Sequence, residues 1–177
     1  MKKIIAFGAS NSKTSINKEL ATYTANLFKE YSAEILDLNE YEMPIYSKDL
    51  EEKNGIPQLT KDFYNKLGTA DLIIISFAEY NGAYTSAFKN IFDWTTRHEG
   101  KMFQNKPMLL MATSPGERGG QTVLDMAKNR IPFHDGEIKG DFSLPNFEQN
   151  FDTTQGITNE DLKKDLLKIV EHIQSTI

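Results

Sequence analysis

The chain has 177 residues, of which 39% are hydrophobic and 25% are charged, and this is the size and composition of one domain with a real core. It contains no cysteine, which excludes disulfides and thiol catalysis and favours a cytoplasmic location. A net charge of −5 argues against broad nucleic-acid binding, and no apolar stretch approaches the ~20 residues of a membrane span. No residues recur at metal-ligand spacing, so no metal is expected. We expect a single domain over residues 1–177.

The first third of the chain predicts two strands around one helix. Ile4–Gly8 is apolar on both faces, as in a buried strand of a parallel sheet. A polar loop follows, and apolar residues from Ile16 to Tyr31 then recur at helical spacing. A second short strand is predicted at Glu34–Leu38. Residues 39–57 are rich in charge and contain Pro and Gly, which predicts a long irregular connection.

The middle of the chain contains its strongest strand. A short helix is expected over Leu59–Leu67, ended by Gly68. The unbroken aliphatic run of Asp71–Phe77 is typical of a central strand covered on both faces. A loop over residues 78–83 leads into a helix whose apolar residues lie between Phe88 and Trp94.

The last third predicts two more strands and two helices. Met108–Ala112 is a strand that ends in a loop over residues 113–120, and a helix around Val123–Ala127 follows. Ile138–Leu144 is a weaker strand. The final helix begins with Thr158 as its N-cap and carries a buried apolar stripe.

Strands alternate with helices through the whole chain, which predicts a parallel sheet with helices on both faces. In such sheets, ligands bind beyond the carboxyl ends of the strands. Three loops leave this edge: the first loop (residues 10–15), the second loop (78–83) and the third loop (113–120). All three are rich in small, polar or glycine residues, so this edge is the expected binding site.

The first loop has the composition of an anion site, because hydroxyl side chains precede a helix N-terminus. The dinucleotide pattern G-x-G-x-x-G is absent, since only Gly8 is present. The P-loop pattern is one residue short, and Ser12 stands where its second glycine belongs, so an NTPase is disfavoured. A monophosphate site fits better. Helix capping by Ser10, Ser12 and Ser15 remains the competing interpretation.

Ordinary structural roles compete at other positions too. Tyr80 followed by Asn81–Gly82 is as typical of an ordinary turn as of a ligand contact. The glycines of the third loop could simply allow positive φ angles in a turn. Phe92 and Trp94 fit either the core or a subunit interface.

Three motifs at these loops resemble those of the NADPH-dependent FMN reductase family, which includes flavin-dependent quinone, chromate and azo-dye reductases. The family pattern G-S-x-R-x-x-S-x-N falls on Ala9–Asn17, where Ala9 and Ser12 replace the glycine and the arginine. The pattern P-E-Y-N-x-x followed by K-N-x-x-D-W falls on residues 78–83 and 89–94 and departs only at the proline. The pattern S-x-G-x-x-G-G is complete over Ser114–Gly120.

The resemblance implies a flavodoxin-like three-layer sandwich with a five-stranded parallel sheet of order 2-1-3-4-5. It implies bound FMN, NADPH or NADH as co-substrate, and hydride transfer through the flavin to FMN, a quinone, chromate or an azo compound. A homodimer or homotetramer is expected, to which an apolar face around Phe88, Phe92 and Trp94 would be suited. The alternative is a flavodoxin-type electron carrier, but its T-x-T-G-x-T loop is absent.

The resemblance also assigns site residues. Phosphate contacts fall on Ser10, Ser12, Ser15, Ile16 and Asn17. The flavin ring would be lined by Glu79, Tyr80, Asn81, Gly82, Ser114, Pro115, Gly116 and Gly119.

No obligatory acid or base is expected, so no catalytic residue is assigned. Backbone N–H groups of Ser114–Gly116 would face the negative charge that develops at flavin N1–O2. Without the family arginine the phosphate loses a bidentate partner, and Lys13 could replace it only as a point charge.

Overall fold

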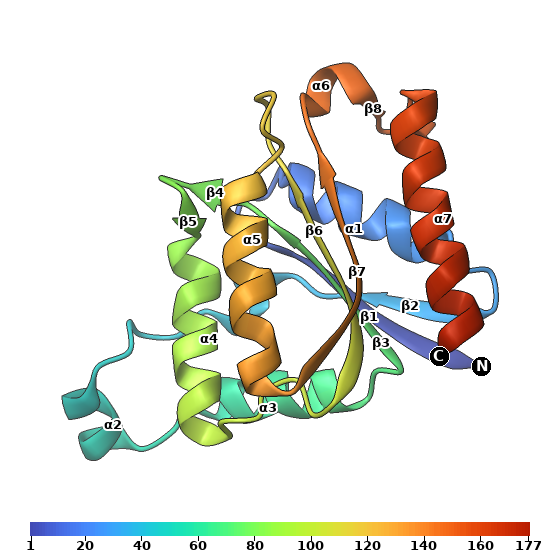
Figure 1. Cartoon of the computed structure of the whole chain (residues 1–177). Coiled ribbons are helices and arrows are strands. Elements are labelled where there is room, and N and C mark those ends of the chain that lie inside the picture. Colours follow the sequence, from blue (N-terminus) through green and yellow to red (C-terminus); the bar gives the residue numbers. More distant parts are fainter.

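The computed structural model describes residues 1–177 and contains a five-stranded parallel sheet (Figure 1). Its strands are β1 (Lys2–Ala9), β2 (Tyr31–Ile35), β3 (Leu72–Phe77), β6 (Lys106–Thr113) and β7 (Gly136–Leu144). Their order is β2-β1-β3-β6-β7, and every pair is parallel. This confirms the predicted flavodoxin-like fold and strand order.

Helices cover both faces of the sheet. On one face lie α3 (Gln58–Gly68), α4 (Ser86–His98) and α5 (Gln121–Arg130), and on the other lie α1 (Ile16–Asn26) and α7 (Glu160–Thr176). Successive residues of each strand point to opposite faces, so the central strands supply apolar side chains to two separate hydrophobic clusters. The unbroken aliphatic runs in the sequence follow from this double burial.

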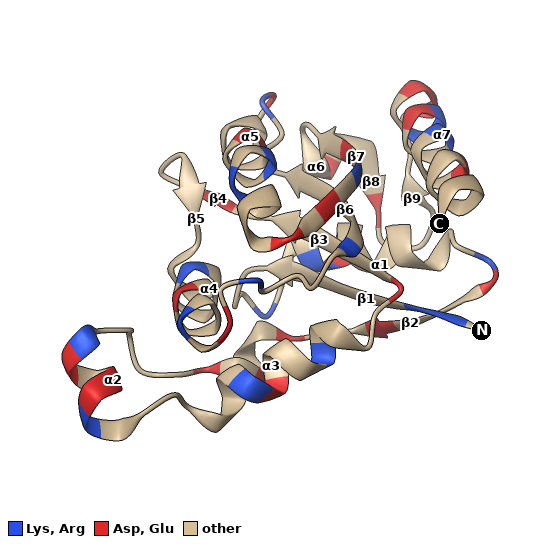
Figure 2. Cartoon of the chain, turned by 60° about the horizontal axis from the view of Figure 1, so that its bottom comes forward, with Lys and Arg blue, Asp and Glu red and all other residues tan.

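Shorter elements fill the connections. They are η1 (Leu38–Tyr41), α2 (Lys48–Asn54), β4 (Glu79–Tyr80), β5 (Ala83–Tyr84), η2 (Ile131–His134), α6 (Phe147–Asn150), β8 (Phe151–Asp152) and β9 (Gly156–Ile157). Acidic and basic residues are interspersed along α2 and α7 (Figure 2). None of the helices combines the length and the apolar composition that crossing a membrane requires.

The second strand differs from its prediction, because it spans Tyr31–Ile35 and not Glu34–Leu38. It is an edge strand that pairs with β1 alone, and its residues are only partly buried or exposed. Leu36 and Leu38 are buried just beyond this strand, and the Leu36 N–H still donates to the Ala6 carbonyl of β1 at 2.9 Å. These buried apolar residues explain why the sequence pattern predicted the strand over Glu34–Leu38. The first helix accordingly ends at Asn26 and does not reach Tyr31.

Three further boundaries differ. The connection over residues 39–57 contains α2, a helix without buried residues that therefore leaves no hydrophobic period in the sequence. Gly68 is the last residue of α3, with Thr69 as the C-cap. Asn159, not Thr158, caps α7, and its side chain accepts hydrogen bonds from the backbone N–H groups of the first turn.

The aromatic residues of α4 belong to the core. Phe88 and Trp94 are 1% exposed and Phe92 is 6% exposed, so they form no apolar outer face for a subunit contact. The indole Nε1 of Trp94 donates to the carbonyl of Pro44 at 2.8 Å. The motif that contains these residues thus holds the connection before α2 against α4.

Candidate functional site

The end of β1 and the start of α1 are in close contact, and Gly8 makes this possible. A Cβ atom at Gly8 would overlap the backbone nitrogen of Lys18. The helix then begins after Ser15, whose Oγ accepts a hydrogen bond from the Lys18 N–H at 3.2 Å. The capping interpretation of Ser15 is therefore confirmed.

Hydroxyl groups organise the first loop from within. Ser10 Oγ accepts from the Ser12 N–H at 3.1 Å, and Ser12 Oγ accepts from the Thr14 N–H at 3.3 Å. The backbone N–H groups of Ile16 and Asn17 make no hydrogen bond with the protein. Unpaired donors at the positive end of the α1 dipole form a site suited to an anion.

Asn17 has a role that the sequence did not indicate. Its side chain is 2% exposed, and Oδ1 accepts from Ser76 Oγ at 2.7 Å and from the Thr113 N–H at 3.1 Å. Its Nδ2 donates to the Thr113 carbonyl at 3.1 Å. The side-chain amide therefore joins α1 to the ends of β3 and β6. The backbone N–H of Asn17 makes no hydrogen bond with the protein and stays available to a ligand.

The second loop is a hairpin of β4 and β5. Asn81 and Gly82 have φ angles of 54° and 73°, as in a type I′ turn, which confirms the turn interpretation. The Glu79 carboxylate accepts a hydrogen bond from the Val123 N–H at 2.9 Å. Because the N-cap of α5 is a glycine without a side chain, Glu79 supplies the cap from a distant part of the chain. Tyr80 is 55% exposed on this hairpin.

The glycines of the third loop occupy their positions for different structural reasons. Gly119 and Gly120 have φ angles of 58° and 74°, and a Cβ on Gly119 would overlap Ser143 Oγ. Their presence follows from backbone conformation and packing. Gly116 has no positive φ, and the nearest atom to its Cβ position is Ser114 Oγ at 4.0 Å. The space beside Gly116 is therefore open.

The three loops line one cavity of about 210 Å³, which we call the loop cavity. Its lining residues are Ser10, Ser12, Thr14, Ser15, Ile16, Asn17, Ala78, Glu79, Tyr80, Thr113, Ser114 and Pro115.

The sequence predicted most of this lining but not all of it. Thr14, Ala78 and Thr113 were missed, although each directly adjoins a residue that the motifs select. The predicted residues outside the cavity lining are Asn81, Gly82, Gly116 and Gly119.

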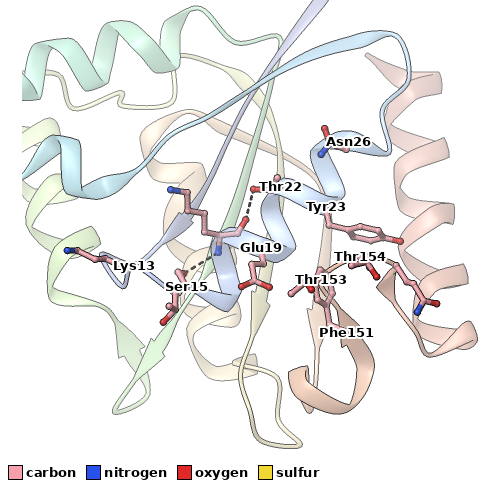
Figure 3. A pocket seen from close by; sticks show the side chains of 13 residues that line it. Lys13, Ser15, Glu19, Thr22, Tyr23, Asn26, Phe151, Thr153 and Thr154 are labelled. Carbon is pink, nitrogen blue, oxygen red and sulfur yellow. Dashed lines mark hydrogen bonds between the residues drawn. The ribbon is translucent and has the colours of Figure 1, made fainter.

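A larger cavity of about 520 Å³ lies beside the first loop, between α1 and the β8–β9 hairpin (Figure 3). We call it the hairpin cavity; nothing in the sequence predicted it. Lys13 and Lys18 are its cationic residues. Lys18 Nζ lies 2.6 Å from Asp37 Oδ2, and this contact, with hydrogen bonds from Asn39, lowers the pKa of Asp37 to about 2. Lys13 forms no ion pair.

Comparison with known proteins relates this chain to flavoenzymes. The model of the family described as NADPH-dependent FMN reductase matches residues 2–149, which include all three loops. An uncharacterized protein of Mycoplasma pneumoniae is 28% identical over 155 residues, covering 85% of this chain and 91% of that protein. A 2-hydroxy-1,4-benzoquinone reductase of a Burkholderia species is 26% identical over 166 residues, covering 92% of this chain and 88% of that enzyme.

A solved structure has a similar fold. It is FerB, a flavoenzyme NAD(P)H:(acceptor) oxidoreductase from Paracoccus denitrificans, with a TM-score of 0.76 and 22% identity. The similarity covers 99% of this chain and 98% of that one.

Proposed function

The chain belongs to the NADPH-dependent FMN reductase family, and on this premise we propose that the loop cavity is its FMN site. The family is one of oxidoreductases that use FMN and NAD(P)H. The observation that carries the proposal is the convergence of three loops, far apart in sequence, on one cavity at the carboxyl edge of the sheet. We propose that residues 1–177 act as one FMN-binding domain.

The phosphate of FMN would lie at the N-terminus of α1. The free N–H groups of Ile16 and Asn17 and the hydroxyls of Ser10, Ser12 and Thr14 are suited to its acceptor oxygens. Ser12 cannot provide the bidentate, charged contact of the family's arginine, so we expect this loop to hold FMN less tightly than the full motif would.

The flavin ring would lie between the second and third loops. Tyr80 is exposed at one side, and the N–H groups of Ser114 and Gly116 are free of protein hydrogen bonds at the other. These donors can stabilise negative charge at the ring. The loop cavity is smaller than the ~300 Å³ of sites that enclose a small molecule, so part of the flavin would stay open to a second ligand.

When bound, FMN supplies hydride acceptance from NAD(P)H and hydride donation to a second substrate. The chain's own groups bind and orient the flavin, and no side chain in the loop cavity is required as an acid or base. We propose FMN, a quinone, chromate or an azo compound as the acceptor; the benzoquinone reductase and NAD(P)H:(acceptor) oxidoreductase among its relatives support this class. A homodimer or homotetramer in the cytoplasm remains our expectation.

The test is direct turnover by the purified protein. We expect a yellow protein that releases FMN on denaturation and oxidises NADPH with menadione or ferricyanide. A colourless protein that gains no flavin spectrum with added FMN would contradict the proposal. Reduction only through a separate reductase would favour an electron carrier, which family membership disfavours.

A further inference from the structure

The hairpin cavity is a built feature of the fold. Its β8–β9 hairpin packs on Tyr23 of α1: the Tyr23 and Phe151 rings are 5.6 Å apart and perpendicular, and Gly156 lies directly against the Tyr23 ring. Asp152 Oδ1 accepts from the N–H groups of Thr154 and Gln155 at 2.8 and 2.9 Å, which orders the turn. The walls of the cavity are therefore fixed on both sides.

The chemistry of its lining is that of a polar ligand site. Most of the lining side chains carry hydroxyl, amide or charged groups, and the two aromatic rings lie together at the hairpin. Since Lys18 is paired with Asp37, Lys13 is the cation left for a ligand, and Glu19 is the one carboxylate in the lining. Lys13 lies on the side of the first loop and Tyr23 toward the hairpin (Figure 3). A ligand with an anionic end and a hydrogen-bonding ring would match this order.

The two cavities meet at the first loop, because Thr14 and Ser15 line both. A group bound at the N-terminus of α1 can thus continue into either cavity. The volume of about 520 Å³ is within the ~300–1,000 Å³ of small-molecule sites.

We propose that the hairpin cavity binds the adenosine 5′-phosphate unit of a dinucleotide whose other half lies in the loop cavity, as the flavin half of FAD, or against the flavin bound there, as the nicotinamide half of NAD(P)H. The proposal rests on the proposed FMN site. Two dinucleotides carry such a unit: FAD, in which it extends from the FMN phosphate, and NAD(P)H. Lys13 would pair with the added phosphate, the hydroxyl and amide groups of the lining would bind the ribose, and Glu19 would accept hydrogen bonds from a ribose hydroxyl or an adenine amino group.

The test is a variant that fills the cavity away from the first loop. Thr22 lines the hairpin cavity but not the loop cavity, and its hydroxyl donates to the Lys18 carbonyl at 2.7 Å. Thr22→Trp places a large ring there. Thr69→Trp is the matched control, since Thr69 makes the same kind of bond, to the Lys66 carbonyl at 2.8 Å, next to the amino end of β3. Gln155→Trp, on the exposed turn, is the second variant if Thr22→Trp is unstable.

The flavin-free protein is titrated with FMN and with FAD by fluorescence, and the KM for NADPH is measured on the FMN-loaded protein. We expect Thr22→Trp to raise the Kd for FAD about tenfold and to leave the Kd for FMN within about twofold of wild type. Thr69→Trp should change neither Kd. A raised KM for NADPH with FAD affinity unchanged would support the adenylate unit with NAD(P)H as its source. If FMN binds and Thr22→Trp changes neither the Kd for FAD nor the KM for NADPH, the proposal for the hairpin cavity is overturned while the proposed FMN site stands. If FMN does not bind the wild type, the FMN site itself fails.

Discussion

The Glu79 carboxylate lies 2.9 Å from the backbone nitrogen of Val123, although the two residues are on different loop–helix units. Glu79 begins the β4–β5 hairpin, and Val123 is in the first turn of α5, directly after the third loop. One hydrogen bond therefore fixes the second loop relative to the third. Because the flavin ring is proposed to lie between these loops, this contact sets the width of its site.

Removing the cap should weaken both the fold and the site. We expect Glu79→Ala to lower the free energy of unfolding by about 1 kcal/mol, as for loss of a helix cap, and to weaken FMN binding. Glu79→Gln keeps an acceptor oxygen and should recover most of both. Urea unfolding measures the stability of the two variants, and FMN titration measures their affinity. If Glu79→Ala matches wild type in both, the contact is unimportant.

Much of the fold could be predicted because the central strands are buried on both faces. Leu72–Phe77 is fully buried, and its aliphatic run can be recognised without any partner. The edge strand β2 and the helix α2 lack such a signal: the first is only half covered and the second has no buried residue. The β8–β9 hairpin is too short to produce a period.

The site could be predicted as far as its loops, but not the role of each side chain. Asn17 matches the family motif, yet whether its amide faces a ligand or the interior depends on Ser76 and Thr113, which are distant in sequence. The same holds for Glu79, whose partner is in α5. Motifs locate such residues, while three-dimensional packing assigns their hydrogen bonds.

Asn17 should contribute mainly to stability. Asn17→Ala leaves Ser76 Oγ and the Thr113 N–H and carbonyl without their buried partner, and we expect a loss of about 3 kcal/mol. Asn65→Ala on the exposed side of α3 is the control and should stay within ~0.5 kcal/mol of wild type. Chemical denaturation measures both. A similar, small effect of the two substitutions would show that the Asn17 network is dispensable.

A substitution at Gly116 should affect ligand binding without affecting stability. Its Cβ position is open and its φ is not positive, so Gly116→Val should leave the free energy of unfolding within ~0.5 kcal/mol of wild type. Gly116 lies next to Pro115 of the cavity lining, and the flavin is proposed to extend beyond the cavity along this segment, so we expect the added side chain to raise the Kd for FMN about tenfold. Gly100→Val, also in open space, should leave the Kd unchanged. An unchanged FMN affinity of Gly116→Val would place the flavin elsewhere.

The Lys18–Asp37 ion pair should make the free energy of unfolding depend on pH. Its hydrogen bonds lower the pKa of Asp37 from 3.8 to about 2, so its stabilisation is present above pH 3.8 and is lost as the pH falls through 2. The Asp37 side chain is 35% exposed, which limits the contribution to ~1 kcal/mol. Asp37→Asn should lower the free energy of unfolding at pH 7 by up to this amount. The difference from wild type should shrink between pH 4 and pH 2; a difference independent of pH would contradict the assignment.

The most direct test of the central claim is a crystal structure of the protein with FMN. We predict the phosphate on the N–H groups of Ile16 and Asn17 and the flavin ring between Tyr80 and the Ser114–Gly116 segment. FMN bound at another surface, with the loop cavity containing only water, would contradict it.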